Sequence, residues 1–171
     1  MDIEVLIPTK NRPDFLVLAL QSLMFQTLRP EHISVYDQSD TSVMHYPAYR
    51  KMVAALDQVD IHVHYTYQRA NFSSMSEMRQ ASWQQVTAPF VFTLDDDAIV
   101  SPNTLEVCAR AMEDTQAGLV MATTFDVDKE NIRHPYDTGP NEQWIRRDTF
   151  LRDQLPIFEL PWVNGSHWCL R

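Results

Sequence analysis

The sequence FVFTLDDDAIVSP, residues 90–102, combines a short apolar run, three consecutive carboxylates and the start signal of a helix. The apolar run is typical of a buried strand. Ser101 and Pro102 are residues preferred at the N-cap and at the first position of a helix, so we expect a helix to open there. The stretch therefore predicts a strand, an acidic connection and a helix in immediate succession.

The acidic connection, Asp95 to Asp97, admits two interpretations. Most charge runs are solvated surface, so it could be a hydrated loop that merely ends a strand. On an extended backbone, however, Asp95 and Asp97 would point to one side and Asp96 to the other. Two hard oxygen ligands at a strand end suit a divalent cation that keeps positions open for phosphate oxygens. The strand before the run and the helix signal after it favour the metal-site interpretation.

Length and composition restrict the class of protein. A chain of 171 residues with 44% hydrophobic and 22% charged residues suits one globular domain with a real core. The formal charge of −9 argues against a general nucleic-acid or anionic-membrane surface. We find no apolar run long enough to span a bilayer and no signal peptide. Cys108 and Cys169 form neither a disulfide framework nor a zinc spacing, so we expect a cytoplasmic protein.

Strand and helix patterns alternate over the first 125 residues. This alternation predicts an α/β fold with a mostly parallel sheet. The expected strands are residues 3–8, 32–37, 61–67, 89–94 and 119–125. The expected helices are residues 13–27, one following Pro47, one from the Ser74 and Glu77 capping box to about Thr87, and one from Ser101–Pro102 to Gly118.

Three of the expected strands end in polar clusters, namely residues 9–12, 37–40 and 95–97. Ligands of parallel α/β sheets bind at the carboxyl ends of the strands, so the clusters should meet at one edge. The chain has only three glycines, and none follows the first strand. A dinucleotide fingerprint or a P-loop needs glycines at that position. A diphosphate bound here would therefore need another source of positive charge, and a cation held by the aspartates is the obvious candidate.

The segments IEVLIPTKNR (3–12), VYDQSD (35–40) and FTLDDDAIVSP (92–102) together resemble the GT-A glycosyltransferases of family 2. This family includes many bacterial transferases and the cellulose, chitin and hyaluronan synthases. The resemblance covers about the first 105 residues well and the remainder loosely. It implies a Rossmann-like GT-A fold, in which helices flank a mostly parallel central sheet. It also implies a nucleotide-sugar donor, with a UDP-sugar expected, Mn²⁺ or Mg²⁺, and inversion at the anomeric carbon.

By this resemblance, Pro8, Thr9 and Arg12 line the nucleoside pocket. Asp37 matches the acidic residue that hydrogen-bonds the base, and Arg79 falls where the family often has an arginine near the nucleotide. The corresponding structural interpretations are a surface charge for Arg12, a turn residue for Asp37 and an exposed helix residue for Arg79.

The resemblance also assigns roles to the acidic run. Asp95 and Asp97 match the two ends of the DxD motif. The first usually faces the ribose and the metal, and the second usually ligates the metal that bridges the diphosphate. We therefore expect Asp95 and Asp97 at the metal, and we count Asp95 and Asp96 among the donor-binding residues.

The catalytic base is not identified by the sequence. In the family it comes from an acidic pair downstream of a glycine-containing strand, and NGSHWCLR (164–171) resembles that preceding segment. We therefore expect a single domain in which residues 1–125 bind the donor and residues 126–171 begin the acceptor-side half, with the chain possible as a truncated form. Asp126, Asp128 and Glu159 are stand-ins for the base without motif support.

Three other functions stay open at this stage. A sugar nucleotidyltransferase also holds metal with carboxylates, but it usually has a glycine-rich loop where this chain has TKNR. A donor-binding domain without transfer activity would explain the missing base. A plain interaction module would leave the three polar strand ends without an explanation. The sugar and the acceptor, whether saccharide, lipid or protein, cannot be predicted from the sequence.

Overall fold

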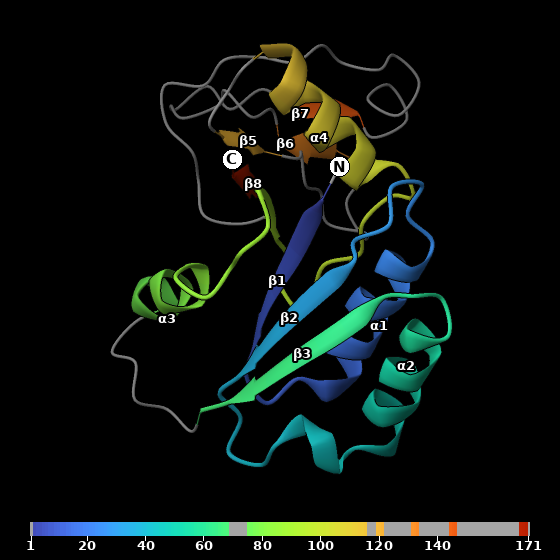
Figure 1. The fold of residues 1–171 in the computed structure, drawn as a ribbon, viewed down its shortest axis with the longest axis vertical. Coiled ribbons are helices and arrows are strands. Elements are labelled where there is room, and N and C mark those ends of the chain that lie inside the picture. Colours follow the sequence, from blue (N-terminus) through green and yellow to red (C-terminus); the bar gives the residue numbers. More distant parts are fainter. Residues whose placement is uncertain are drawn as a thin grey trace.

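The computed structural model describes residues 2–68, 75–115, 119–121, 131–133, 144–146 and 168–170. Strands and helices alternate along most of this chain, as the hydrophobic pattern predicts (Figure 1). In chain order the elements are β1 (Ile3–Thr9), α1 (Pro13–Met24), β2 (His32–Asp37), the 3₁₀ helix η1 (Val43–His45), α2 (Pro47–Asp57), β3 (His62–Tyr67), α3 (Met75–Trp83), β4 (Phe90–Thr93), α4 (Thr104–Thr115), β5 (Leu119–Met121), β6 (Asn131–Arg133), β7 (Trp144–Arg146) and β8 (Trp168–Leu170).

The main sheet has six strands in the order β3-β2-β1-β4-β8-β5. Strands β3, β2, β1 and β4 are parallel, which confirms the predicted fold class. Strand β8 lies in the segment NGSHWCLR and runs antiparallel between β4 and β5. This position in the sheet was not predicted, because it depends on pairing with strands far away in the sequence. Strands β6 and β7 form a separate antiparallel pair.

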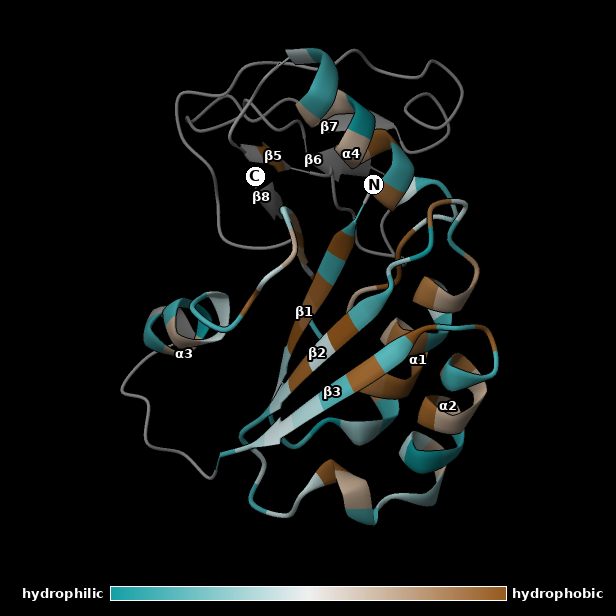
Figure 2. Cartoon of the chain, viewed as in Figure 1, coloured by the Kyte–Doolittle hydropathy of each residue, from teal (hydrophilic) through white to brown (hydrophobic). Residues whose placement is uncertain are grey.

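The parallel strands are covered on both faces, with α1 and α2 on one side and α3 on the other (Figure 1). All seven residues of β1 are buried, as expected for the central strand of such a sheet. Ile7 and Val35 pack into the core with Leu20 of α1. On the opposite face Leu6 and Tyr36 pack against α3. Figure 2 shows hydrophobic segments in brown along the strands and on parts of α1 and α2.

Two helix boundaries differ from the prediction, because α1 ends early and α4 begins late. The cause is a joint between the two elements. Gln26 Nε2 donates to the carbonyl of Ser101 at 2.7 Å, and the Thr27 amide donates to the carbonyl of Pro102 at 2.7 Å. Ser101 and Pro102 therefore form a turn that holds the end of α1, and they precede α4 instead of capping it.

One further helix boundary differs and some others fall outside the described residues, whereas β1, β2 and β3 agree with the prediction to within one residue. Helix α3 ends at Trp83, a few residues before the predicted end. Ser74, Gly118 and the last residues of the predicted strand 119–125 lie outside the described residues. Within the described part of the chain, no helix is both long and apolar enough to cross a membrane.

Candidate functional site

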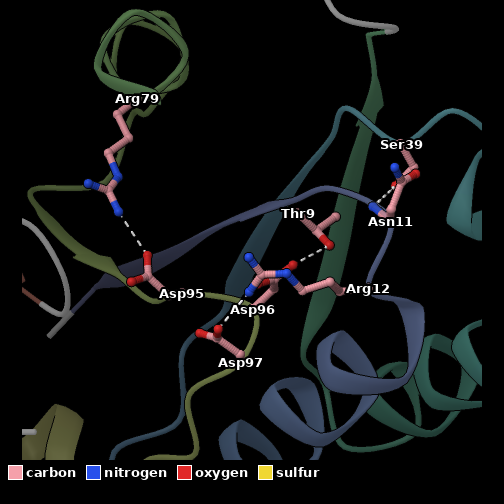
Figure 3. Close-up of polar contacts among 8 residues, drawn as sticks. All are labelled: Thr9, Asn11, Arg12, Ser39, Arg79, Asp95, Asp96 and Asp97. Atoms are coloured by element: carbon pink, nitrogen blue, oxygen red, sulfur yellow. Dashed lines mark hydrogen bonds and ion pairs between the residues drawn. The ribbon is translucent and has the colours of Figure 1, made fainter. Parts of the chain in front are cut away.

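The three polar strand ends meet at one edge of the sheet, as predicted (Figure 3). The register sets Thr9 beside Asp37 in the neighbouring strand. The segment after β1 then contacts both other clusters. Thr9 Oγ1 donates to Asp96 Oδ2 at 2.7 Å, and the Asn11 amide donates to Ser39 Oγ at 2.7 Å. Residues 9–12 thus bridge the ends of β2 and β4.

The acidic run is a turn and not an extended segment, which corrects the expected alternation of its side chains. Strand β4 ends at Thr93, and the Ala98 amide donates to the carbonyl of Asp95 at 3.1 Å. Because the backbone turns over Asp95–Ala98, Asp96 and Asp97 both reach Arg12, whereas Asp95 reaches α3 (Figure 3). The carboxylates of Asp95 and Asp97 therefore contact different arginines.

Arg12 lies at the start of α1 and bridges two carboxylates of the acidic turn. Its Nη1 atom lies 2.6 Å from Asp97 Oδ2 and 3.2 Å from Asp96 Oδ1. The side chains of Arg12 and Asp97 are 49% and 50% exposed, so this ion pair can exchange partners without breaking the core. Arg12 lies at the predicted edge of the sheet, and its contact with a nucleoside stays a prediction.

Arg79 reaches the acidic turn from the opposite side of the sheet. Its Nη2 atom donates to Asp95 Oδ1 at 2.8 Å, and both side chains are mostly buried. Helix α3 is held against the sheet by Met78, which packs on Leu6 and Tyr36. Arg79 therefore projects from a packed helix toward the cluster, which excludes the interpretation as a merely exposed helix residue.

Asp96 is the most buried carboxylate of the acidic turn, with 5% of the residue exposed. Burial raises its pKa, while the hydrogen bond from Thr9 and the charge of Arg12 act in the opposite direction. Both of its oxygens accept bonds from protein groups, Oδ2 from Thr9 and Oδ1 from Arg12. In this structure Asp96 ties the acidic turn to the end of β1, and its contact with a donor stays a prediction.

Asp37 is 1% exposed and organises the loop that follows β2. Its Oδ1 accepts from the Ser39 amide at 2.8 Å, and its Oδ2 accepts from the Val43 amide at 2.8 Å and from Tyr65 OH at 2.6 Å. Burial and the bond to the Asp37 carboxylate raise the pKa of Tyr65. The contact of Asp37 with a base stays a prediction. The structure adds a second role, because this carboxylate satisfies three internal donors.

Pro8 is buried inside β1, where the register sets it beside Tyr36. It therefore lies in the sheet directly before the polar cluster 9–12, and a contact with a nucleoside stays a prediction. The stand-ins for the base, namely Asp126, Asp128 and Glu159, lie outside the described residues.

The acidic turn has the donor chemistry for a divalent cation. Among the described residues, no group of three or more His, Cys, Asp or Glu side chains is arranged to hold a metal ion. Mg²⁺ in nucleotide sites, however, commonly takes only one or two carboxylates and completes its shell with phosphate oxygens and water. The half-exposed Asp97 and the partly exposed Asp95 fit that pattern. Each carboxylate contacts its arginine through one oxygen atom, Asp97 through Oδ2 and Asp95 through Oδ1.

The sequence placed Asn11 and Ser39 in the predicted polar clusters but gave neither a role, and it did not single out Tyr65. Asn11, Ser39 and Tyr65 form hydrogen bonds that fix the two loops. For Asn11 a signal existed, because an Asn in a glycine-free turn after a strand is a candidate for left-handed backbone. For Ser39 the signal was its place in the polar cluster 37–40, whereas no local signal distinguishes Tyr65 from a surface residue.

The sequence model of glycosyl transferase family 2 matches residues 4–170 of the chain. This chain belongs to glycosyl transferase family 2. The match extends from the first strand to the last, so the family domain includes the antiparallel strand β8. No curated protein sequence matches the chain.

Several solved structures share the fold of this family 2 domain. Staphylococcus aureus TarS 1-349 has a TM-score of 0.64 and 17% identity, and the match covers 90% of this chain and 49% of TarS 1-349. The complex of TarS 1-349 with UDP-GlcNAc gives the same TM-score and identity, with coverage of 90% and 47%. The mannosyltransferase PcManGT from Pyrobaculum calidifontis, in complex with GDP-Man and Mn²⁺, has a TM-score of 0.58 and 19% identity. The match covers 79% of this chain and 36% of PcManGT. The chain thus spans at most about half the length of these proteins, and at these identities the likeness concerns the fold.

Proposed function

We propose that the carboxyl edge of the sheet binds a nucleotide-sugar donor together with Mn²⁺ or Mg²⁺, and that the domain transfers the sugar to an acceptor hydroxyl with inversion. The observation that carries this proposal is the pair of arginines on the acidic turn. Arg12 contacts Asp97 from one side at 2.6 Å, and Arg79 contacts Asp95 from the other at 2.8 Å.

The charges at this edge suit a diphosphate and a cation at the same time. A guanidinium presents several N–H donors that match phosphate oxygens, and carboxylate oxygens are the preferred ligands of hard divalent cations. In the ligand-free arrangement the two groups neutralise one another. A donor with its cation offers each group a new partner of the opposite charge, so binding exchanges ion pairs instead of leaving buried charges unpaired.

We assign the roles of the residues as follows. Asp97, as the more exposed carboxylate, is the main ligand of the cation, and Asp95 is the second. Arg12 and Arg79 turn toward the diphosphate, while Thr9 and Asp96 hold the acidic turn against β1. When bound, the cation would supply Lewis-acid stabilisation of the negative charge on the departing nucleoside diphosphate. The acceptor hydroxyl must also lose a proton to a carboxylate.

A UDP-sugar is the first donor to test, because TarS 1-349 shares the fold and was solved with UDP-GlcNAc. The GDP-Man complex of PcManGT makes a GDP-sugar the alternative. The acceptor class, whether saccharide, lipid or protein, stays open in this proposal.

Calorimetric titration of the chain with UDP and GDP, each with MnCl₂ and with EDTA, tests the donor part of the proposal. We expect one nucleoside diphosphate to bind and the binding to depend on the cation. Failure of both to bind in MnCl₂ would refute the proposed site. A transfer and donor-hydrolysis assay with the sugar nucleotide of the binding base then distinguishes a transferase from a donor-binding domain. Product formation from sugar phosphate and nucleoside triphosphate would instead indicate a nucleotidyltransferase.

A further inference from the structure

Asn11 has an unusual backbone for a residue other than glycine. Its φ angle is 57°, and Asp60 is the only other non-glycine residue with positive φ among the described residues. The left-handed region is unfavourable for most side chains and is tolerated best by Asn and Asp after glycine. The chain turns sharply at Asn11, between the end of β1 and the start of α1.

Three hydrogen bonds hold Asn11 in this conformation. Its amide donates to Ser39 Oγ at 2.7 Å, its Nδ2 donates to Asp40 Oδ2 at 2.9 Å, and its Oδ1 accepts from the Asp40 amide at 2.9 Å. We refer to Asn11, Ser39 and Asp40 as the Asn11 clamp. The clamp is anchored in the interior, because Ser39 is 1% exposed and its own amide donates to the buried Asp37 carboxylate.

The residue that follows the clamp is Arg12, whose guanidinium contacts the acidic turn. The Arg12 side chain is 49% exposed, so packing alone does not select one rotamer. Its backbone is held on both sides, by the Asn11 clamp before it and by the ring of Pro13 after it. The direction in which the Arg12 side chain leaves the backbone therefore depends on the turn at Asn11.

We propose that Asn11 is a positioning residue for the donor, and that its clamp on Ser39 and Asp40 aims the Arg12 guanidinium at Asp96, Asp97 and the diphosphate that binds beside them. The effect on a ligand rests on the proposed donor-binding function. The effect on the Arg12–Asp97 ion pair does not, because both groups are present in the protein itself.

Two glycine variants separate the clamp from the backbone. Asn11→Gly still permits a positive φ but removes both side-chain bonds to Asp40. Asp60→Gly is the matched control, since Asp60 has φ 60° and lies in the exposed turn between α2 and β3. Affinity for UDP, or for GDP if that is the base bound, is measured in MnCl₂. The ¹⁵N NMR signals of the arginine guanidinium groups, assigned with Arg12→Ala, report the ion pair without ligand.

We expect Asn11→Gly to weaken nucleotide binding about tenfold and to collapse the separate Arg12 Nη signals into one averaged signal. Asp60→Gly should change neither. In an Arg12→Ala background, Asn11→Gly should lower the nucleotide affinity by less than about a further twofold. A residue that acts through Arg12 has no further effect once Arg12 is absent.

Retention of the Arg12 signals and of the affinity in Asn11→Gly would overturn the inference, and so would a full additional loss in the Arg12→Ala background. If the unaltered protein binds neither nucleotide in MnCl₂, the proposed donor function fails. In that case the guanidinium signals alone decide whether the clamp positions Arg12.

Discussion

Asp37 and Asp97 lie at the same edge of the sheet, yet the fold surrounds them in different ways. Asp37 is 1% exposed and accepts hydrogen bonds from two backbone amides and a tyrosine hydroxyl. The Asp97 side chain is 50% exposed, and its ion pair is with the half-exposed Arg12. Asp37 is the last residue of β2, and Asp97 lies in the turn after β4. Asp37 was expected to contact the base and Asp97 to ligate the metal.

The comparison shows that burial distinguishes a carboxylate that stabilises its loop from one that can exchange its partner for a ligand. Removing a buried acceptor leaves several donors unsatisfied, so such a carboxylate is tied to the stability of its loop. An exposed ion pair contributes little to stability and can exchange its partner for a ligand at small cost. We therefore expect substitutions of Asp37 to act mainly on folding and substitutions of Asp97 to act mainly on binding.

The largest effect is expected for Asp37→Ala. Loss of the carboxylate leaves the Ser39 amide, the Val43 amide and Tyr65 OH without their acceptor, and we expect the free energy of unfolding to fall by about 3 kcal/mol. Urea unfolding measures this change. Asp57→Ala is the control, since that side chain is 72% exposed and should change stability by less than about 0.5 kcal/mol. Unchanged stability of Asp37→Ala with weaker uridine binding would instead support a direct contact with the base.

Asp97→Asn should show the opposite behaviour. The amide has nearly the same size but no charge, so the protein loses its most exposed anionic ligand for a cation. We expect unaltered stability within about 0.5 kcal/mol and at least about a tenfold loss of Mn²⁺-dependent UDP affinity, or about 1.4 kcal/mol. Titration with UDP in MnCl₂ and in EDTA separates cation-dependent from cation-independent binding. If Mn²⁺ increases the UDP affinity of the variant as much as that of the unaltered protein, the assignment of Asp97 to the metal is contradicted.

Tyr65→Phe sharpens the interpretation of the Asp37 network. It removes one of the three donors to Asp37 and the partner of Ser42 Oγ, while the ring stays in place. We expect a loss of about 1 kcal/mol in the free energy of unfolding. Tyr67→Phe is the matched control, because Tyr67 is 41% exposed and its hydroxyl bonds to the backbone carbonyl of Ser39. Equal losses of unfolding free energy in both variants would show that the buried bond to Asp37 stabilises the protein no more than the exposed bond of Tyr67 does.

The smallest effect concerns the pH dependence of stability through Asp96. Burial raises its pKa in the folded protein above the ordinary value of 3.8. The stabilising contribution of this group is thus complete below that value and is lost as the pH rises through the raised pKa. Relative to Asp96→Asn, the unaltered protein should lose stability from pH 3.8 upward in EDTA, as measured by urea unfolding. If the stability of the unaltered protein relative to Asp96→Asn instead increases with pH, Thr9 and Arg12 lower the pKa of Asp96 by more than burial raises it.

The sequence by itself determined the α/β class, the order of the elements and the edge at which the polar residues gather. Hydrophobic periodicity is a local property, and it located β1, β2 and β3 almost to the residue and indicated a helix after Pro47. The parallel topology then followed from the alternation of strands and helices, and with it the meeting of the three polar strand ends.

The tertiary structure alone decided which polar residues at that edge bond to one another and which are buried. The bond between Thr9 and Asp96 joins residues 87 positions apart, and the bond between Tyr65 and Asp37 joins residues 28 apart. No local propensity encodes such contacts. Likewise, the joint between α1 and α4 and the insertion of β8 depend on partners from distant segments. Burial and pairing of a carboxylate are properties of the packed chain, because they depend on what the rest of the sequence brings to it.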